Sequence, residues 1–310
     1  MLPARIIPIF VPAHTATMKK TIISLLTIVL CATLSAQPIA NKPLVQNPDT
    51  LRILAVGNSF SDDGTMYLPD LLEGANIQNV IIARLYIGGC SLERHCKEYK
   101  ENLHNYRYSK STENKWVTVK EEASLTDGLC DEPWDIVTIQ QSSPLSGFWE
   151  SHQPWMHELI GIIRERCTNP EATIVWHQTW AYASNSDHKN FPDYDRDQSK
   201  MYLMICDCLS RIQDSEDLPV VIPCGNTIQA LRSTRISTEK ELTRDGYHLD
   251  YRHGRYAAAC TWFEALVEPV MGVSVRKSKA RLEGTENEIS RKDAKLCRRW
   301  AAKTVKELGK

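Results

Sequence analysis

The chain has 310 residues, of which 42% are hydrophobic and 24% charged, and its formal net charge is −1. The charge is unevenly distributed, because residues 276–310 hold 12 Lys/Arg against 5 Asp/Glu (+7) and residues 1–36 hold three cations and no acid (+3), which leaves −11 for residues 37–275. This acidic body argues against nucleic acid as the main partner. We expect the basic C-terminal stretch to form the solvated side of a helix, with a binding patch as the alternative.

Residues 1–36 have the pattern of a secretory signal peptide. Lys19 and Lys20 precede an apolar stretch at 21–34, and small residues follow it. A basic pair, an apolar core of about 7–15 residues and small residues at its exit define such a signal, and this stretch is too short for a membrane span. Met18 stands directly before the basic pair, so we expect translation to start there. The mature chain is predicted to be exported, to the periplasm or the extracellular space.

Nine cysteines remain once Cys31 leaves with the signal. An odd number leaves at least one thiol unpaired unless it bonds between chains. Their spacing does not match a zinc ligand set, the nearest pattern being Cys206-Asp207-Cys208. We therefore expect no metal site, and most of these side chains should be small buried hydrophobes. The sequence does not pair them.

The first structured stretch runs from Leu51 to Ser61 and reads LRILAVGNSFS. Its apolar half, closed by glycine, is typical of a buried strand in a parallel sheet, and the apolar residues that follow recur at helical spacing. Ser59 therefore lies in a tight turn between a strand and a helix. Ligands of open α/β sheets bind beyond the carboxyl ends of strands, which makes Ser59 a candidate for chemistry. A helix-capping serine is the alternative.

Alternating strands and helices follow. Further strands are predicted at 79–87, 135–139, 173–176 and 220–222, and helices at 66–76, 124–131, 155–166, 201–212, 255–267 and 290–308. Residues 92–121 have weak periodicity and suit a helix and then a hairpin around 115–119, and 184–198 reads as a long loop. Five short strands alternating with helices predict an α/β fold, a five-stranded parallel sheet with helices on both faces, in a single domain from 45 to 310.

Groups suited to chemistry follow every predicted strand. In chain order they are Ser59, Gly88-Gly89, Gln140-Gln141, His177 and, after the fifth strand, Asp245 and His248. A serine hydroxyl needs a base to take its proton, and the base needs a carboxylate to hold its tautomer. The spacing of Asp245 and His248 can place both on one face of a turn, and His suits the base role near neutral pH. The pattern predicts nucleophilic acyl transfer.

An acyl-transfer intermediate also needs N–H donors for its oxyanion. The Ser59 backbone, a Gly88 or Gly89 backbone and a Gln carboxamide are the candidates in this sequence. Each of these residues also has a structural alternative, as a cap or a turn residue.

The motifs GNSFSDD, RLYIGGCSLERH, WDIVTIQQSS, WHQTWAYA and TRDGYHLD together resemble the SGNH/GDSL hydrolases, and more narrowly an exported branch described as a domain of unknown function. The resemblance spans about residues 50–268. It implies a flavodoxin-like, three-layer α/β/α fold and ester hydrolysis, often deacetylation of carbohydrates. An α/β-hydrolase fits less well, because its G-x-S-x-G motif is missing.

Carried over residue by residue, the resemblance matches Ser59 to the nucleophile, Asp245 to the orienting acid, His248 to the base and Gly89 (or Gly88) to the oxyanion glycine. Two positions depart from the family pattern. Asn58 stands where an Asp is usual, and Gln140-Gln141 stands where an oxyanion Asn is usual. We expect Gln141, or failing that Gln140, to supply the third donor.

The sequence thus predicts an exported serine esterase that removes acyl groups, most simply acetyl, from a carbohydrate or glycoconjugate, without a metal or organic cofactor. Expected substrate contacts are Asn58, Gly88, His177 and an aromatic wall of Trp176, Trp180, Tyr182, Trp149 and Tyr247, for which core packing is the alternative. His95, His188 and His253 are expected on the surface. Transfer of the acyl group to a glycan hydroxyl, or glycan binding without catalysis, stays open. The acyl group, the sugar and the oligomeric state are not specified.

Overall fold

The computed structural model describes residues 44–308 except 46–47, 113–114, 215–217 and 219. The predicted signal peptide therefore lies outside the described residues. The described part of residues 43–310 is one compact unit. Within it, no helix has both the length and the apolar character needed to cross a membrane.

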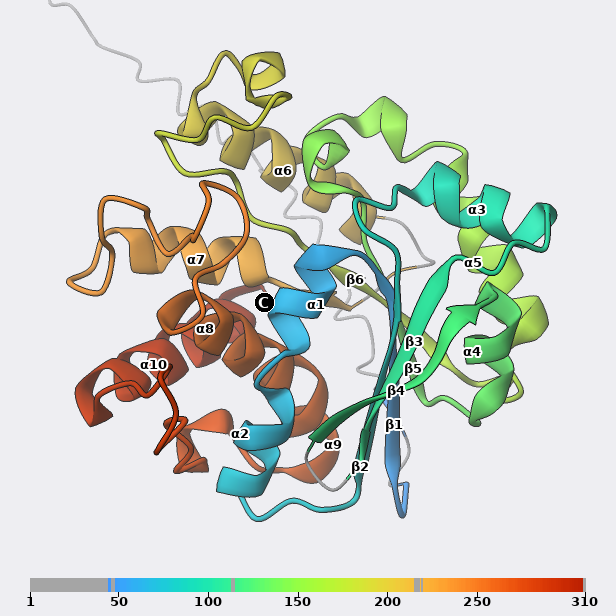
Figure 1. Cartoon of the computed structure of the whole chain (residues 1–310), viewed down its shortest axis with the longest axis horizontal. Helices are drawn as coiled ribbons and strands as arrows, with labels where there is room; N and C mark the ends of the chain where they lie inside the picture. Colours follow the sequence, from blue (N-terminus) through green and yellow to red (C-terminus); the bar gives the residue numbers. More distant parts are fainter. Residues whose placement is uncertain (1–43, 46–47, 113–114, 215–217, 219, 309–310) are drawn as a thin grey trace, which may run out of the picture. The chain divides into compact units, whose positions relative to one another are not determined.

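A seven-stranded sheet forms the centre of this unit, with strand order β4-β3-β2-β1-β5-β6-β7 (Figure 1). The strands are β1 (Leu51–Gly57), β2 (Val80–Tyr86), β3 (Tyr106–Thr112), β4 (Lys115–Ala123), β5 (Ile136–Ile139), β6 (Thr173–His177) and β7 (Val221–Ile222). The five strands β2, β1, β5, β6 and β7 are parallel, whereas β3 and β4 pair antiparallel at one edge.

The α/β class is confirmed, and the predicted strand number is wrong only at this edge. The five predicted parallel strands are present, but the hairpin extends over residues 106–123 and adds two strands to the same sheet. Strand β4 carries no apolar run, because most of its residues are exposed. Polar, lysine-containing strands of this kind are typical of sheet edges, where one row of backbone groups faces solvent.

Helices cover both faces of the sheet (Figure 1). One layer contains α1 (Ser59–Thr65), α2 (Leu68–Gly74), α7 (Cys224–Arg232), α8 (His253–Trp262), α9 (Glu268–Met271) and α10 (Arg291–Leu308), and the other contains α3 (Leu92–Lys100), α4 (Leu125–Asp131) and α5 (Trp155–Arg166). Helix α6 (Gln198–Gln213) contributes apolar residues to both layers. Shorter turns are η1 (Ser143–Leu145), η2 (Trp149–Ser151), η3 (Phe191–Tyr194), η4 (Phe263–Val267) and η5 (Val275–Lys277).

Strand β1 shows why two layers form. Ile53 and Ala55 pack into one hydrophobic cluster, and Leu54 and Val56 pack into the other. Successive strand residues point to opposite faces, so a continuously apolar strand must be covered on both sides. The three-layer α/β/α arrangement follows from this pattern.

The chain reverses direction across the sheet at β1. Strand β2 lies on one side of β1 and β5 on the other, and the later strands continue outward from β5. This is the flavodoxin-type order, whose ligand site lies beyond the carboxyl ends of the strands at the reversal point. Ser59 follows β1 directly, so it stands at that point.

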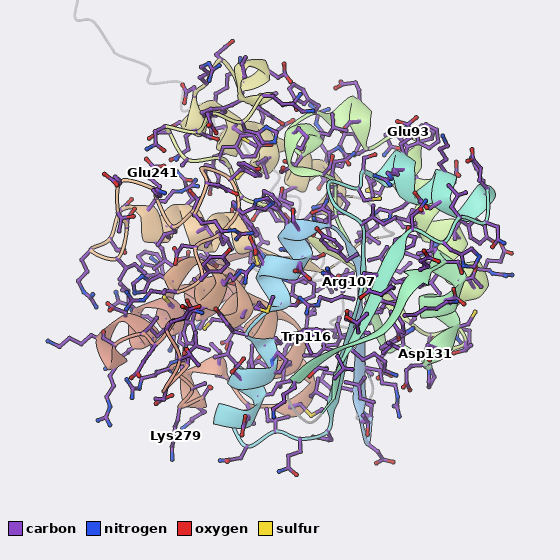
Figure 2. All side chains as sticks on the ribbon, in the orientation of Figure 1. Glu93, Arg107, Trp116, Asp131, Glu241 and Lys279 are labelled. Carbon is purple, nitrogen blue, oxygen red and sulfur yellow. The ribbon has the colours of Figure 1, made fainter. Side chains whose placement is uncertain are left out.

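The β3–β4 hairpin also supports the helix that carries Ser59. The Trp116 indole, labelled in Figure 2, donates from Nε1 to the Met66 carbonyl at 3.0 Å, between α1 and α2. The Arg84 guanidinium lies 3.4 Å from the centre of the Trp116 ring and pairs with Asp62 of α1 at 2.7 Å. Burial lowers the pKa of Arg84 to about 10, although Asp62 opposes this shift.

Candidate active site

Ser59, His248 and Asp245 form a continuous chain of hydrogen bonds beyond the carboxyl end of β1. Ser59 is the first residue of α1, and its Oγ lies 2.8 Å from His248 Nε2. His248 Nδ1 lies 2.7 Å from Asp245 Oδ2. Since a carboxylate only accepts, Nδ1 carries the proton and Nε2 is free to accept from the Ser59 hydroxyl. We call these three residues the serine–histidine–aspartate chain.

The loop that contains Asp245 is folded around that carboxylate. Asp245 Oδ1 accepts the backbone N–H groups of Tyr247 and His248 at 3.1 and 2.7 Å. Burial alone would raise the pKa of Asp245, but the hydrogen bonds from the His248 ring and from the loop backbone hold it below its ordinary value. Gly246 has φ +90°, and a Cβ there would lie 2.9 Å from Ser186 Oγ, so this turn requires glycine. The carboxylate is therefore held ionised beside the imidazole.

Asp63 ties this loop to the helix that carries Ser59. Its carboxylate is 1% exposed and accepts from Arg244 (3.0 Å), Arg255 of α8 (2.6 Å) and the Leu249 backbone N–H (2.9 Å). Arg244 and Leu249 flank the segment that holds Asp245 and His248. One buried carboxylate on α1 thus sets the distance between Ser59 and its histidine. Asp63 was not among the predicted site residues, although it stands within the GNSFSDD motif.

Buried amides link the ends of four neighbouring strands. Asn58 Nδ2 donates to the Cys90 carbonyl at 2.9 Å, beyond β2, and Gln140 Nε2, beyond β5, donates to Asn58 Oδ1 at 2.8 Å. Gln140 Oε1 in turn accepts from Nδ1 of His177, at the end of β6, at 2.6 Å. Asn58 Oδ1 also accepts the Phe60 N–H and so caps α1.

This arrangement changes the expected roles of these residues. Asn58 and His177, predicted as substrate contacts, are buried and engaged with protein atoms. Burial lowers the pKa of His177 to about 3, so its ring is neutral. Gln141, the first candidate for the third oxyanion donor, is also engaged: its Nε2 donates to the Ser151 carbonyl and hydroxyl. The second candidate, Gln140, donates one of its two amide N–H groups to Asn58 Oδ1.

The turn after β2 brings Gly88 and Gly89 to the surface beside this edge. Gly89 has φ +64°, and a Cβ there would meet no atom within 4 Å. The backbone conformation, rather than lack of space, therefore calls for glycine. The Ser59 N–H, the first of α1, has no carbonyl one turn earlier to accept it within the helix.

The prediction of an aromatic wall that contacts the substrate is wrong for three of its five residues. Trp180 and Tyr182 are fully buried, and Trp176 is 4% exposed, so none of them offers a face to a sugar. Trp180 stacks on Phe60 of α1 with ring centres 4.3 Å apart, and its Nε1 donates to the Tyr247 carbonyl at 2.8 Å. These rings pack beneath the serine–histidine–aspartate chain and support it. Trp149 is half-buried, 5.7 Å from His152.

Tyr247 and His188 are the rings beside the histidine. The Tyr247 ring lies 4.3 Å from the His248 ring and 4.7 Å from the His188 ring, and both Tyr247 and His188 are half-buried. Burial, with the Lys189 and His248 charges, lowers the pKa of His188. His95 was expected on the surface but is buried, with Nδ1 2.7 Å from the Tyr106 hydroxyl. No periodic pattern in the sequence distinguishes the positions of His188 and His95.

Among the described residues, no group of three or more His, Cys, Asp or Glu side chains has a geometry that could hold a metal ion. The nine cysteines of the described residues are all free thiols.

Comparison with known proteins gives one family match and several structural likenesses. A family model described as a domain of unknown function, DUF4886, matches residues 52–304. A DUF4886 family protein from Bacteroides uniformis ATCC 8492 is 38% identical, with a TM-score of 0.76 over 84% of this chain and 97% of that one. The family match confirms the resemblance to a domain of unknown function that the sequence motifs indicate.

Two other solved structures are more distant. A protein from Slackia heliotrinireducens, whose description proposes an SGNH hydrolase, is 19% identical, with a TM-score of 0.48 over 70% of this chain and 98% of that one. An acetylxylan esterase from Geobacillus stearothermophilus is 10% identical, with a TM-score of 0.44 over 79% of this chain and its whole length (100%). No curated protein matches the chain.

Proposed function

The chain belongs to the DUF4886 family, and we propose that it is a serine esterase whose nucleophile is Ser59. One observation carries the proposal: the hydrogen bonds from Asp245 through His248 to Ser59, at 2.7 and 2.8 Å. A serine with a hydrogen-bonded base that is itself oriented by a carboxylate is the arrangement that acyl transfer requires. The sequence resemblance to SGNH hydrolases points to the same chemistry.

The reaction has two halves. Ser59 Oγ attacks the ester carbonyl carbon while His248 Nε2 takes the hydroxyl proton, and the carbonyl oxygen becomes an oxyanion. The intermediate collapses, the bond to the alcohol breaks, and the alcohol leaves with the proton from Nε2. A water then attacks the acyl-Ser59 ester with His248 again as base, which releases the carboxylic acid and restores the serine. Asp245 stabilises the imidazolium that forms in each half.

Backbone donors hold the oxyanion in this proposal. The Ser59 N–H is free of intrahelical bonds, and the Gly89 N–H belongs to the exposed turn after β2. Each well-placed donor of this kind contributes about 10²–10³ in rate. Gln140 acts as a positioning residue through Asn58, and Gln141 as a positioning residue for the loop that contains Ser151.

The substrate is an acylated carbohydrate or glycoconjugate, with acetyl as the simplest acyl group. This finer assignment rests on the sequence resemblance. Ser59 and Tyr247 are half-buried, so the nucleophile and one ring are within reach of an external ester. Transfer to a glycan hydroxyl differs only in the acceptor, and a dependence of product formation on added sugar would reveal it. The intact hydrogen-bond chain favours catalysis over binding alone.

We also propose that the chain is exported and that residues 1–36 are removed. The basic pair and apolar stretch at 19–34 support this, and they lie outside the described residues. Expression of the full chain with its own N-terminus, and the mass of the product outside the cytoplasm, tests it. A product that keeps residues 1–36 and stays in the cytoplasm contradicts export.

Hydrolysis of p-nitrophenyl acetate by the chain from residue 37 tests the proposed esterase. Ser59→Ala and His248→Ala should each abolish turnover above background, with unchanged thermal unfolding. Matched controls are Ser210→Ala, on an exposed face of α6, and His104→Ala, an exposed histidine, and both should keep full activity. Turnover that survives Ser59→Ala would contradict the assignment.

A further inference from the structure

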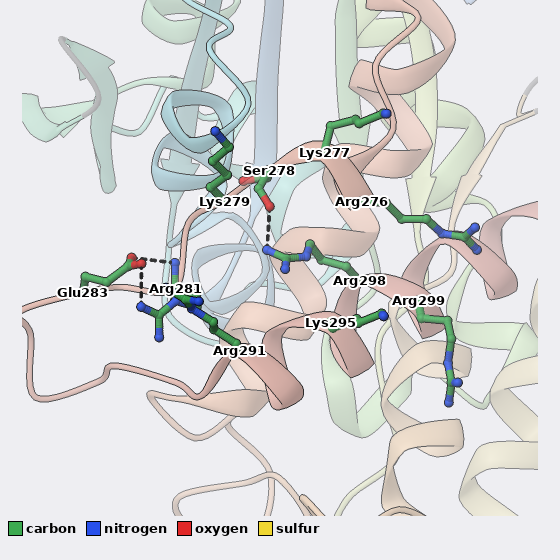
Figure 3. A pocket seen from close by; sticks show the side chains of 10 residues that line it. All are labelled: Arg276, Lys277, Ser278, Lys279, Arg281, Glu283, Arg291, Lys295, Arg298 and Arg299. Carbon is green, nitrogen blue, oxygen red and sulfur yellow. Dashed lines mark hydrogen bonds and ion pairs between the residues drawn. The ribbon is translucent and has the colours of Figure 1, made fainter.

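A hollow of about 670 Å³ lies between α10 and the segment that precedes it (Figure 3). Its lining consists of Arg276, Lys277, Ser278, Lys279, Arg281, Glu283, Arg291, Lys295, Arg298 and Arg299. Eight of these ten residues are cationic and one is acidic, which gives a formal charge of +7. The hollow shares no residue with the serine–histidine–aspartate chain. We call it the basic hollow.

Two of the eight cations have structural roles. Arg298 donates to the Ser278 carbonyl at 2.6 Å and to the Tyr256 hydroxyl at 3.0 Å. Arg281 pairs with Glu283 at 2.9 Å and with Glu288 at 3.4 Å. These contacts fix the segment that runs over α10; the Arg281 charge is compensated by the two glutamates, whereas Arg298 is held by neutral oxygen acceptors.

The other six cations have no such partner. Their side chains are exposed and make no ion pair or hydrogen bond with any residue in the described ranges; they are Arg276, Lys277, Lys279, Arg291, Lys295 and Arg299. Acids are not scarce in this chain, since residues 37–275 carry a net charge of −11. The positive charge is thus concentrated around one hollow rather than compensated.

Hydrogen bonds hold the backbone of the segment that carries three of these cations. Glu264 accepts the Val275 N–H at 2.8 Å at the start of η5, which carries Arg276 and Lys277. The Lys279 N–H donates to the Gly74 carbonyl of α2 at 2.8 Å. Below this segment, α10 presents three more cations toward the hollow (Figure 3). The backbone around the hollow is therefore held in position before any ligand arrives.

This arrangement does not favour the fold. Arg291, Lys295 and Arg299 follow one another at four-residue spacing on one face of α10, and like charges at that spacing repel and destabilise a helix. Arg291 also stands in the first turn, where the helix dipole disfavours a cation. A bound anion would relieve both effects.

The lining indicates the chemistry of that anion. None of the ten lining residues is aromatic, so the basic hollow has no surface for stacking a nucleobase or a neutral sugar ring. Arginine forks bind phosphate and sulfate oxygens in a bidentate manner. The volume falls within the range of about 300–1,000 Å³ found for small-ligand sites. An acidic body also repels a long nucleic acid that would extend beyond the hollow.

We propose that the basic hollow binds a small polyanion that carries several phosphate or sulfate groups. The inference is independent of the proposed esterase activity, because it rests only on residues 276–299. Two sources share this chemistry: a free, multiply phosphorylated compound and a short, sulfated or phosphorylated glycan.

Calorimetric titration of the chain from residue 37 tests the site at about 0.15 M salt. The probes are inositol hexakisphosphate, a sulfated heparin hexasaccharide, a neutral hexasaccharide and a short DNA duplex. The test variant combines Arg291→Glu, Lys295→Glu and Arg299→Glu. The matched control combines Lys292→Glu, Lys303→Glu and Lys306→Glu, which makes the same change in net charge on the same helix outside the hollow.

We expect at least one of the two anionic probes to bind, the neutral sugar not to bind, and the affinity to fall steeply with added salt. The test variant should weaken binding about 100-fold and the control less than about threefold, because only the former places repulsive charge in the lining. Binding of the hexakisphosphate alone identifies a free compound as the source, and binding of the heparin fragment identifies a glycan.

Three results would overturn the proposal: no binding of either anionic probe, equal weakening by the two triple variants, or tighter binding of the duplex than of both small probes. A second variant, Arg276→Gln with Lys277→Gln and Lys279→Gln, removes the opposite side of the lining. It keeps the test decisive if the first variant does not fold, and it should also weaken binding.

Discussion

His177 and His248 lie at the same edge of the sheet, and each donates Nδ1–H to an oxygen of a side chain. His177 donates to the neutral Gln140 amide and is fully buried, with its pKa lowered to about 3 by that burial. His248 donates to the Asp245 carboxylate and is half-buried, with Nε2 on Ser59. The charge of the acceptor and access to solvent, rather than residue type, separate the proposed base from a structural histidine.

The largest effect should come from matched substitutions of the two rings. Asparagine places an amide nitrogen near the position of Nδ1 and removes Nε2, so His248→Asn keeps the Asp245 contact and loses only the base. We expect kcat/KM to fall about 10⁴–10⁶-fold for His248→Asn and by less than about tenfold for His177→Asn. Steady-state kinetics on p-nitrophenyl acetate measures both. Equal losses would remove the distinction between the rings.

Changing the charge of the acceptor sharpens the comparison. Asp245→Asn gives His248 the neutral kind of partner that His177 already has, and we expect kcat to fall about 10³–10⁴-fold. The variant removes the carboxylate charge that stabilises the His248 imidazolium during the reaction. The kcat of the variant and of the unaltered chain, measured across a range of pH, checks this prediction. An unchanged rate at neutral pH would show that the carboxylate is not needed.

Substitution of Asp63 tests whether the loop that contains Asp245 and His248 must be bonded to α1. Asp63→Asn removes the charge that pairs with Arg244 and Arg255, so we expect a stability loss of about 3–5 kcal/mol and a fall in kcat of about 10–100-fold from misplacement of His248. The neighbouring Asp62→Asn is the control, since Asp62 pairs with Arg84 and Arg107, and among the described residues no hydrogen bond or ion pair joins its side chain to the loop. Similar kcat losses for the two variants would contradict the positioning role.

The last prediction concerns stability in acid, where the expected effect per pH unit is the smallest. The folded protein keeps His177 neutral down to about pH 3, whereas the unfolded chain protonates it below about pH 6.5. Its contribution is therefore fully present above pH 6.5 and is lost as pH falls, at about 1.4 kcal/mol per pH unit. Urea unfolding between these limits should show that slope reduced in His177→Asn and unchanged in the exposed control His104→Asn. An unchanged slope in His177→Asn would mean that the ring charges in the folded state.

The parallel core of the fold could be predicted from the sequence because each of its strands is a short apolar run closed by glycine or polar residues. The β3–β4 hairpin could not be predicted as part of the sheet, because β4 is exposed and charged and the hairpin joins the sheet only through the pairing of β3 with β2.

The site was predictable where chemistry depends on spacing along the chain and not where it depends on burial. The strand-end turns and the D-x-x-H spacing indicated Ser59, Asp245 and His248 as partners, and their catalytic roles remain a proposal. The aromatic residues of WHQTWAYA carry no periodic pattern, so nothing in the sequence distinguished an exposed wall from the buried packing under Tyr247. Asp63 was missed because its partners are more than 180 residues away.

The most direct test of the central claim is covalent labelling of Ser59 by a fluorophosphonate, read by peptide mass spectrometry. The proposed mechanism predicts one phosphonyl group on the peptide that contains Ser59. It also predicts no label in Ser59→Ala, a much slower reaction in His248→Asn and an ordinary rate in His177→Asn. A chain that takes no label, or takes it on another residue with Ser59 intact, would contradict the assignment of Ser59 as an activated nucleophile.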